Sequence, residues 1–144
     1  MSPLEIFFIL LSLISYLSSF FLVWLKRERY SILLIGLGLF AQATSSGIRW
    51  YGIGHPPVFG TYEAALAGSW FLLLYTAFSY RSIHGHFRAL SLTTVPIAVL
   101  ILIYGLTFMT ERIPLTISER SLWVDFHALF SWFDWVPQWC QRSR

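Results

Sequence analysis

Residues 6–25 read IFFILLSLISYLSSFFLVWL, a run of twenty residues without a charged side chain. An α-helix rises 1.5 Å per residue, so about twenty residues cross the roughly 30 Å hydrocarbon layer of a bilayer. The run ends at the cluster KRER, residues 26–29, and no basic region precedes it. A cleavable signal would need a basic start and a small-residue cleavage site. The stretch therefore predicts a transmembrane helix.

Three more uncharged runs follow this one, at residues 30–48, 64–80 and 89–110. The run at 64–80 is short, but Tyr62 and Tyr80 can flank it at the membrane interfaces. Short loops make consecutive helices antiparallel neighbours. We therefore expect one multi-pass domain spanning residues 1–144, with its first four helices at about 5–25, 30–48, 62–80 and 89–110.

A fifth segment, residues 121–136, is rich in aromatic side chains but also carries Asp125, His127 and Asp134. Charged groups inside lipid are costly and usually face protein. The segment is compatible with a span packed against neighbours or with a helix lying along the membrane surface. The expected fold is an all-α integral membrane protein: an antiparallel bundle of four transmembrane helices plus a fifth, aromatic-rich membrane or interfacial helix.

The composition supports the membrane class and excludes several others. Apolar residues make up 56% of the chain and charged residues 12%, with a mean hydropathy of +0.63. Soluble domains carry roughly 25% charged residues. The net charge of +3 forms no stripe for nucleic acid, and the single cysteine, Cys140, excludes a disulfide scaffold. No hydrolase, dinucleotide or phosphate-loop motif occurs, so no catalytic residue is assigned.

The distribution of lysine and arginine predicts the orientation. The 26–29 turn, the 81–88 loop and the C-terminal tail hold seven of these residues, and the alternate loops hold three. Because positive residues favour the cytoplasmic side, the N-terminus is expected outside. A bacterial inner membrane is the favoured location over an organellar one. The loops at 49–63 and 111–121 then face the exterior.

Four histidines are the candidate ligands. His55 lies in the stretch 49–63, where prolines and glycines favour a turn-rich path over a helix, and it is compatible with a metal ligand or a turn cap. Glu63 opens the third helix, where a carboxylate complements the helix dipole. His84 and His86 form a His-Gly-His turn that has no third cysteine or carboxylate ligand nearby.

His127 lies among aromatic residues in a segment that begins at the external face. A nitrogen donor between flat apolar walls is what an axial haem ligand requires. The alternative is an interfacial histidine hydrogen-bonded to Asp125 or to a backbone carbonyl.

Two stretches of the chain resemble the CcsA/ResC/CcmC family of cytochrome c assembly proteins. Residues 49–70, RWYGIGHPPVFGTYEAALAGSW, are similar to the opening signature of that family. Residues 119–132, ERSLWVDFHALFSW, are similar to the segment ahead of its haem-handling loop. The positions that match the signature are Arg49, Trp50, Gly54, His55, Pro57, Tyr62, Glu63, Leu66, Ser69 and Trp70.

The resemblance is greatest to the CcsA/ResC branch and implies a role in presenting haem at the external face for attachment to apocytochrome c. It implies a transiently bound b-type haem with His127 as an external axial ligand and Trp123 and Trp132 as pocket walls. No other metal is implied. The implied partners are the lipid bilayer, a CcsB/ResB-like protein and apocytochrome c in a hetero-oligomer, so the chain would be one part of a holocytochrome c synthase system.

The resemblance covers about residues 30–133 and only the N-terminal part of the family. The tryptophan-rich haem-handling loop and the later helices with the second external histidine have no counterpart in this sequence. The chain thus resembles a truncated, split or frameshifted member. Two other interpretations stay open: a small membrane anchor or scaffold subunit of an electron-transfer complex, and an inactive truncated family member.

Overall fold

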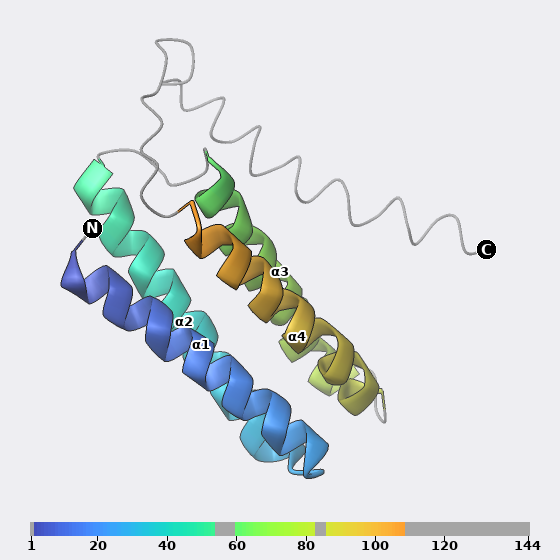
Figure 1. The fold of residues 1–144 in the computed structure, drawn as a ribbon. Helices are drawn as coiled ribbons and strands as arrows, with labels where there is room; N and C mark the ends of the chain where they lie inside the picture. The colour runs from blue at the N-terminus through green and yellow to red at the C-terminus, as the bar shows by residue number, and fades with distance from the viewer. Residues whose placement is uncertain (1, 54–59, 83–85, 109–144) are drawn as a thin grey trace, which may run out of the picture.

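The computed structural model describes residues 2–53, 60–82 and 86–108. These residues form four α-helices and no strand, which confirms the expected all-helical fold. The helices alternate in direction, so the start of α1, the end of α2 and the start of α3 lie at the upper end of the bundle in Figure 1, and the α1–α2 turn lies at the lower end. The helices are α1 (Pro3–Trp24), α2 (Glu28–Ile53), α3 (Thr61–Ser82) and α4 (Phe87–Leu106).

The loop between α2 and α3 is shorter than the sequence predicts. We expected the second helix to end at residue 48 and a turn-rich path from Arg49 onward, but α2 continues to Ile53 and α3 begins at Thr61. The Arg49 side chain, in the part of α2 beyond the predicted end, is held inside the bundle by ion pairs. The predicted fifth segment, 121–136, lies outside the described residues.

Three of the described helices are long and apolar enough to cross a membrane: α1, α2 and α4. The fourth expected span lies in α3, which has 22 residues but is not among these three. Polar residues such as Glu63, Ser69 and Thr76 make α3 less apolar. Large apolar side chains cover the outer faces of the helices, including Phe40 and Phe78, each 69% exposed. Such an exterior suits contact with lipid or with partner helices.

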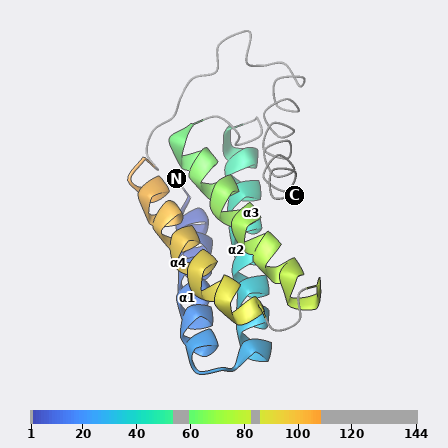
Figure 2. The ribbon, with the colours of Figure 1, turned by 90° about the vertical axis from the view of Figure 1, so that its right-hand side faces the viewer.

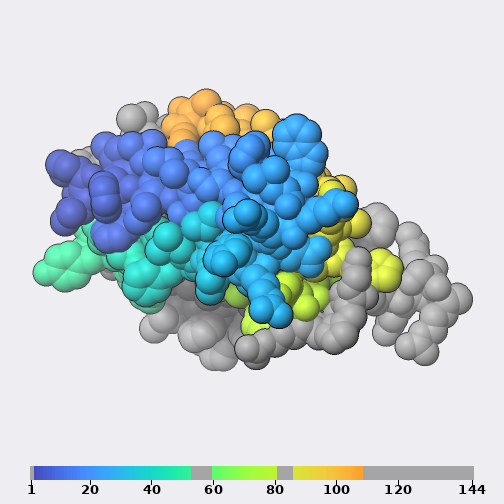
Figure 3. Space-filling model, turned by 90° about the horizontal axis from the view of Figure 1, so that it is seen from below, coloured from blue at the N-terminus to red at the C-terminus, as the bar shows by residue number. Residues whose placement is uncertain are grey.

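The bundle consists of two tightly packed helix pairs, α1 with α2 and α3 with α4, which meet through α1–α4 and α2–α3 (Figure 2). From below, α1 lies between α4 and α2 (Figure 3). Two glycines permit close approach. A methyl group on Gly38 of α2 would overlap the Tyr16 ring of α1, and one on Gly105 of α4 would lie 2.5 Å from the Ala65 Cβ of α3. Small residues have this role where helices pack closely in lipid.

Candidate functional site

A buried ion cluster joins α1, α2 and α3 at the upper end of the bundle. Arg49 Nε donates to Glu63 Oε1 at 2.8 Å, and Arg49 Nη2 lies 2.6 Å from the same oxygen. Arg49 Nη1 donates to Glu5 Oε1 at 3.3 Å. All three side chains are at most 7% exposed. Because an unpaired buried charge is strongly destabilising, each of these groups depends on the others.

Tyr62 covers the cluster from the side of α3. The guanidinium carbon of Arg49 lies 4.6 Å from the centre of the Tyr62 ring, within the range of a cation–π interaction. Tyr62 is only 1% exposed, and its hydroxyl has no hydrogen-bond partner in the described part of the chain. Ser45 of α2 adds a further link to α1, since its hydroxyl donates to the Glu5 carbonyl at 3.3 Å. The cluster is therefore enclosed by side chains from three helices.

A second polar group lies about two turns further down α2, around the amide of Gln42. Tyr16 of α1 donates its hydroxyl proton to Gln42 Oε1 at 2.8 Å. Gln42 Nε2 donates to the Leu66 carbonyl at 2.8 Å and to Ser69 Oγ at 2.9 Å, both on α3. Gln42 thus hydrogen-bonds to α1 and α3 at once, which fixes the depth and rotation of these helices against α2.

The structure brings together the described signature residues, apart from Trp50, as helix contacts near the upper end. Arg49, Tyr62 and Glu63 form the ion cluster, and Leu66 and Ser69 bind the amide of Gln42. Trp70 Nε1 donates to the Leu39 carbonyl at 3.1 Å, while Trp50 is half-exposed. Three signature residues and the three predicted haem-site residues lie outside the described residues: Gly54, His55 and Pro57, and Trp123, His127 and Trp132.

Sequence reasoning missed Glu5, Tyr16 and Gln42. Glu5 left a signal, because it is the only charged residue before Lys26 and directly precedes the long apolar run. A lone carboxyl group at the start of such a run needs a cation from another helix. Gln42 left a weaker signal as the one side-chain amide in α2. Neither signal identifies the partner residue, which depends on how the helices pack.

The geometry holds the two ends of the α2–α3 loop together. Arg49 lies one turn before the end of α2, Glu63 lies in the first turn of α3, and the stretch with His55 connects them. The ion cluster therefore links the end of α2 to the starts of α1 and α3.

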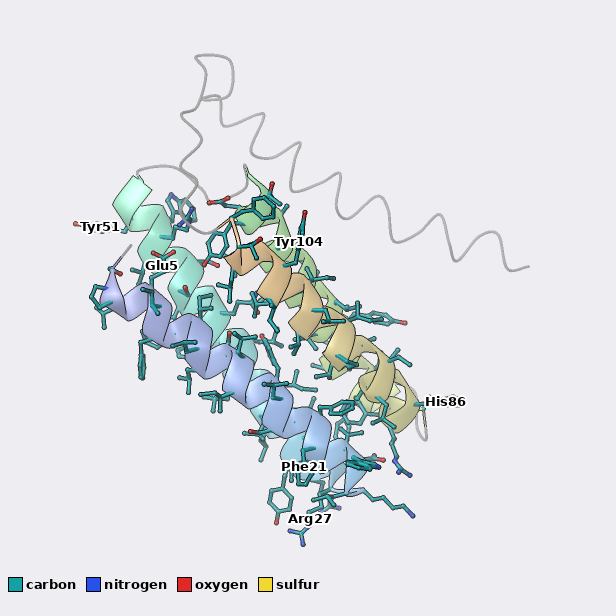
Figure 4. All side chains as sticks on the ribbon, in the orientation of Figure 1. Glu5, Phe21, Arg27, Tyr51, His86 and Tyr104 are labelled. Carbon is teal, nitrogen blue, oxygen red and sulfur yellow. The ribbon has the colours of Figure 1, made fainter. Side chains whose placement is uncertain are left out.

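The described residues offer no complete metal or haem site. No group of three His, Cys, Asp or Glu side chains among them is placed to hold a metal ion. His86 is the only histidine that the described ranges contain; it is exposed and lies at the lower end, before α4 (Figure 4). His84 lies outside these ranges. The two histidines predicted for the external side, His55 and His127, also lie outside these ranges.

Compared with known proteins, the chain matches no family model, no curated protein and no solved structure. The resemblance to the CcsA/ResC/CcmC family, inferred from the stretches at 49–70 and 119–132, stays a prediction.

Proposed function

We propose that this chain is a membrane component of cytochrome c biogenesis of the CcsA/ResC type. It would help to present haem at the external membrane face for attachment to apocytochrome c. One observation carries the proposal: Arg49 and Glu63, which both match the signature and are fourteen residues apart in the chain, form a buried ion pair between α2 and α3. The pattern that resembles the family thus coincides with a structural unit in this chain.

The buried contacts of Arg49 with Glu5 and Glu63 are better explained by a role in positioning the helix ends than by a gain in folding stability. Apolar residues of similar volume often give equal or greater stability than a buried ion pair. An ion pair with directed hydrogen bonds does, however, hold the two helix ends in one arrangement. A binding site requires its side chains to be held in position by surrounding groups. The contacts of Arg49 with Glu5 and Glu63 would provide that support for an external haem-handling face.

The distribution of charge supports the proposed orientation. At the upper end, Arg49 is paired with two carboxyl groups. At the lower end, Lys26, Arg27 and Arg29 of the α1–α2 turn have no ion pair within the described ranges. Unpaired positive charge favours the cytoplasmic side. The proposed orientation has the lower end of the bundle in the cytoplasm and the facing ends of α2 and α3 outside, in a bacterial inner membrane.

Haem would be held by His127, with Trp123 and Trp132 as walls, as the resemblance implies. When bound, haem supplies the iron and the vinyl groups that react with the cysteine thiols of apocytochrome c. The described residues of this chain would form the helical bundle in the membrane and hold the end of α2 and the start of α3 in position. A CcsB/ResB-like partner would contribute to the haem site, as the resemblance implies.

Deletion and complementation in the native host test the proposal. Loss of the gene should lower covalently bound haem in c-type cytochromes, measured by haem staining of denaturing gels. The wild-type chain and a His86→Ala control, which alters the exposed histidine at the lower end, should restore the stain. His127→Ala and Arg49→Leu should fail to restore it. Normal c-type cytochromes in the deletion strain would contradict the proposal and leave the anchor or inactive-member interpretations.

A further inference from the structure

The turn between α1 and α2 has a tight geometry that displays its basic residues at the end of the bundle. Arg27 N–H donates to the Leu22 carbonyl at 2.9 Å, and Lys26 N–H donates to the Val23 carbonyl at 3.0 Å. This pair of hydrogen bonds defines a Schellman motif at the end of α1. In that motif, glycine usually occupies the position whose backbone is in the left-handed conformation. Here Lys26 occupies that position with φ 61°. A lysine is therefore held in a conformation that costs about 1 kcal/mol relative to glycine.

The basic residues of the turn line a recess with two tyrosines. The recess has a volume of about 510 Å³ and is lined by Lys26, Arg27, Glu28, Arg29, Tyr30 and Tyr80. Three cations face one carboxyl group there, and none of the three has an ion pair within the described residues. Tyr80 joins the recess to the α3–α4 end of the bundle, since its ring lies 4.9 Å from the Phe87 ring. The recess is therefore a concave, cationic surface with phenol groups at its edge.

Large apolar side chains lie next to the basic residues of the α1–α2 turn. Trp24 and Leu25, directly before the turn, are 64% and 52% exposed, and Phe21 packs edge-on against Trp24. Figure 4 shows Phe21 and Arg27 at the same lower end of the bundle. A soluble anion would match the cations alone. A phospholipid matches both features, because its acyl chains can cover the apolar side chains while its phosphate contacts the basic ones.

We propose that the α1–α2 turn binds the phosphate headgroup of an anionic phospholipid. Arg27 and Arg29 supply hydrogen-bond donors to the phosphate oxygens, and Lys26 adds a third positive charge. Trp24 and Leu25 lie beside the acyl chains. The proposal requires α1 and α2 to cross a membrane, for which both are long and apolar enough. It does not depend on the role in cytochrome c biogenesis.

Direct lipid binding to the purified full chain in a neutral mild detergent tests this proposal. The probes are dioleoyl phosphatidylglycerol, dioleoyl phosphatidylcholine with the same acyl chains, and inorganic phosphate, and bound lipid is counted by native mass spectrometry. Phosphatidylglycerol should bind at least tenfold more tightly than phosphatidylcholine. Each cation removed should weaken phosphatidylglycerol binding about fivefold, as expected for a basic residue near an anionic headgroup.

Three variants test the contribution of the charged residues in the turn. Lys26→Gly removes one charge at a position where glycine is favoured, so it should weaken lipid binding without lowering the thermal stability. The double variant Arg27→Gln with Arg29→Gln should weaken phosphatidylglycerol binding about 25-fold. Glu28→Gln removes the negative charge of the same recess and should strengthen phosphatidylglycerol binding several-fold. Phosphatidylcholine binding should stay the same in all variants.

Two results would overturn the proposal. One is equal affinity of the wild-type chain for the two lipids, or a preference for phosphatidylglycerol over phosphatidylcholine that is unchanged in both Lys26→Gly and the double variant. The other is binding of inorganic phosphate, sensitive to the same substitutions, as tight as that of phosphatidylglycerol, which would make the occupant a soluble anion.

Discussion

Arg49 and Glu63 lie on opposite sides of the α2–α3 loop and are joined through a single carboxylate oxygen, which lies 2.8 Å from Arg49 Nε and 2.6 Å from Nη2. The third nitrogen of the guanidinium group reaches Glu5 in the first turns of α1. One side chain thus determines the relative positions of three helix ends.

Replacing Arg49 by leucine should destabilise the bundle by about 3–5 kcal/mol, because two buried carboxyl groups lose their cation. Unfolding by sodium dodecyl sulfate in mixed micelles, followed by circular dichroism, measures the change. The matched variant Glu5→Gln keeps a hydrogen-bond acceptor and leaves the pair of Arg49 with Glu63 intact, so its cost should be near 1 kcal/mol. Equal costs for the two variants would show that the guanidinium group does not hold the cluster together.

The hydrogen bond from Tyr16 to Gln42 should appear as coupling in a double-mutant cycle. Tyr16→Phe removes the donor and Gln42→Leu removes the acceptor, and each single variant leaves a buried polar group without its partner. The double variant should therefore cost about 1 kcal/mol less than the sum of the single variants. Strict additivity of the unfolding free energies would indicate that this contact contributes nothing specific.

Two glycines of α2 should respond differently to the same substitution. Gly38→Ala places a methyl group against the Tyr16 ring and should cost about 1–3 kcal/mol, whereas Gly36 has no neighbouring atom within 4 Å. Gly36→Ala should be neutral or stabilising by up to about 1 kcal/mol, since alanine favours helix. Thermal unfolding in detergent compares the two directly. A Gly38→Ala protein as stable as the wild type would mean that α1 and α2 do not pack this closely.

The number and order of the first four helices could be predicted from sequence because uncharged runs between charged residues are a local property. The lower end of the bundle illustrates this: the basic cluster after residue 25 marks the turn, and α2 begins at Glu28. The upper end of the bundle, where α2 ends and α3 begins, could not be predicted in the same way. Its contacts join residues far apart in the chain: Arg49, near the end of α2, pairs with Glu5, which is 44 residues away.

The candidate site was predicted in part. The signature stretch directed attention to Arg49 and Glu63, but a pattern along one chain segment does not show which side chains face each other. Gln42 was missed because a single amide in an apolar helix gives no indication of its partners. Its contacts with Tyr16 and Ser69 follow from the rotation of α1 and α3 against α2, which is set by packing over the whole length of the helices.

The pyridine haemochrome spectrum of the purified chain tests the central claim most directly. The wild-type chain in mild detergent, expressed alone and together with a CcsB/ResB-like partner, is compared with the His127→Ala and His86→Ala variants. The account predicts a b-type haem signal in the wild type with its partner, its loss in His127→Ala, and its retention in His86→Ala. No haem in any wild-type sample, or an unchanged signal in His127→Ala, would contradict it.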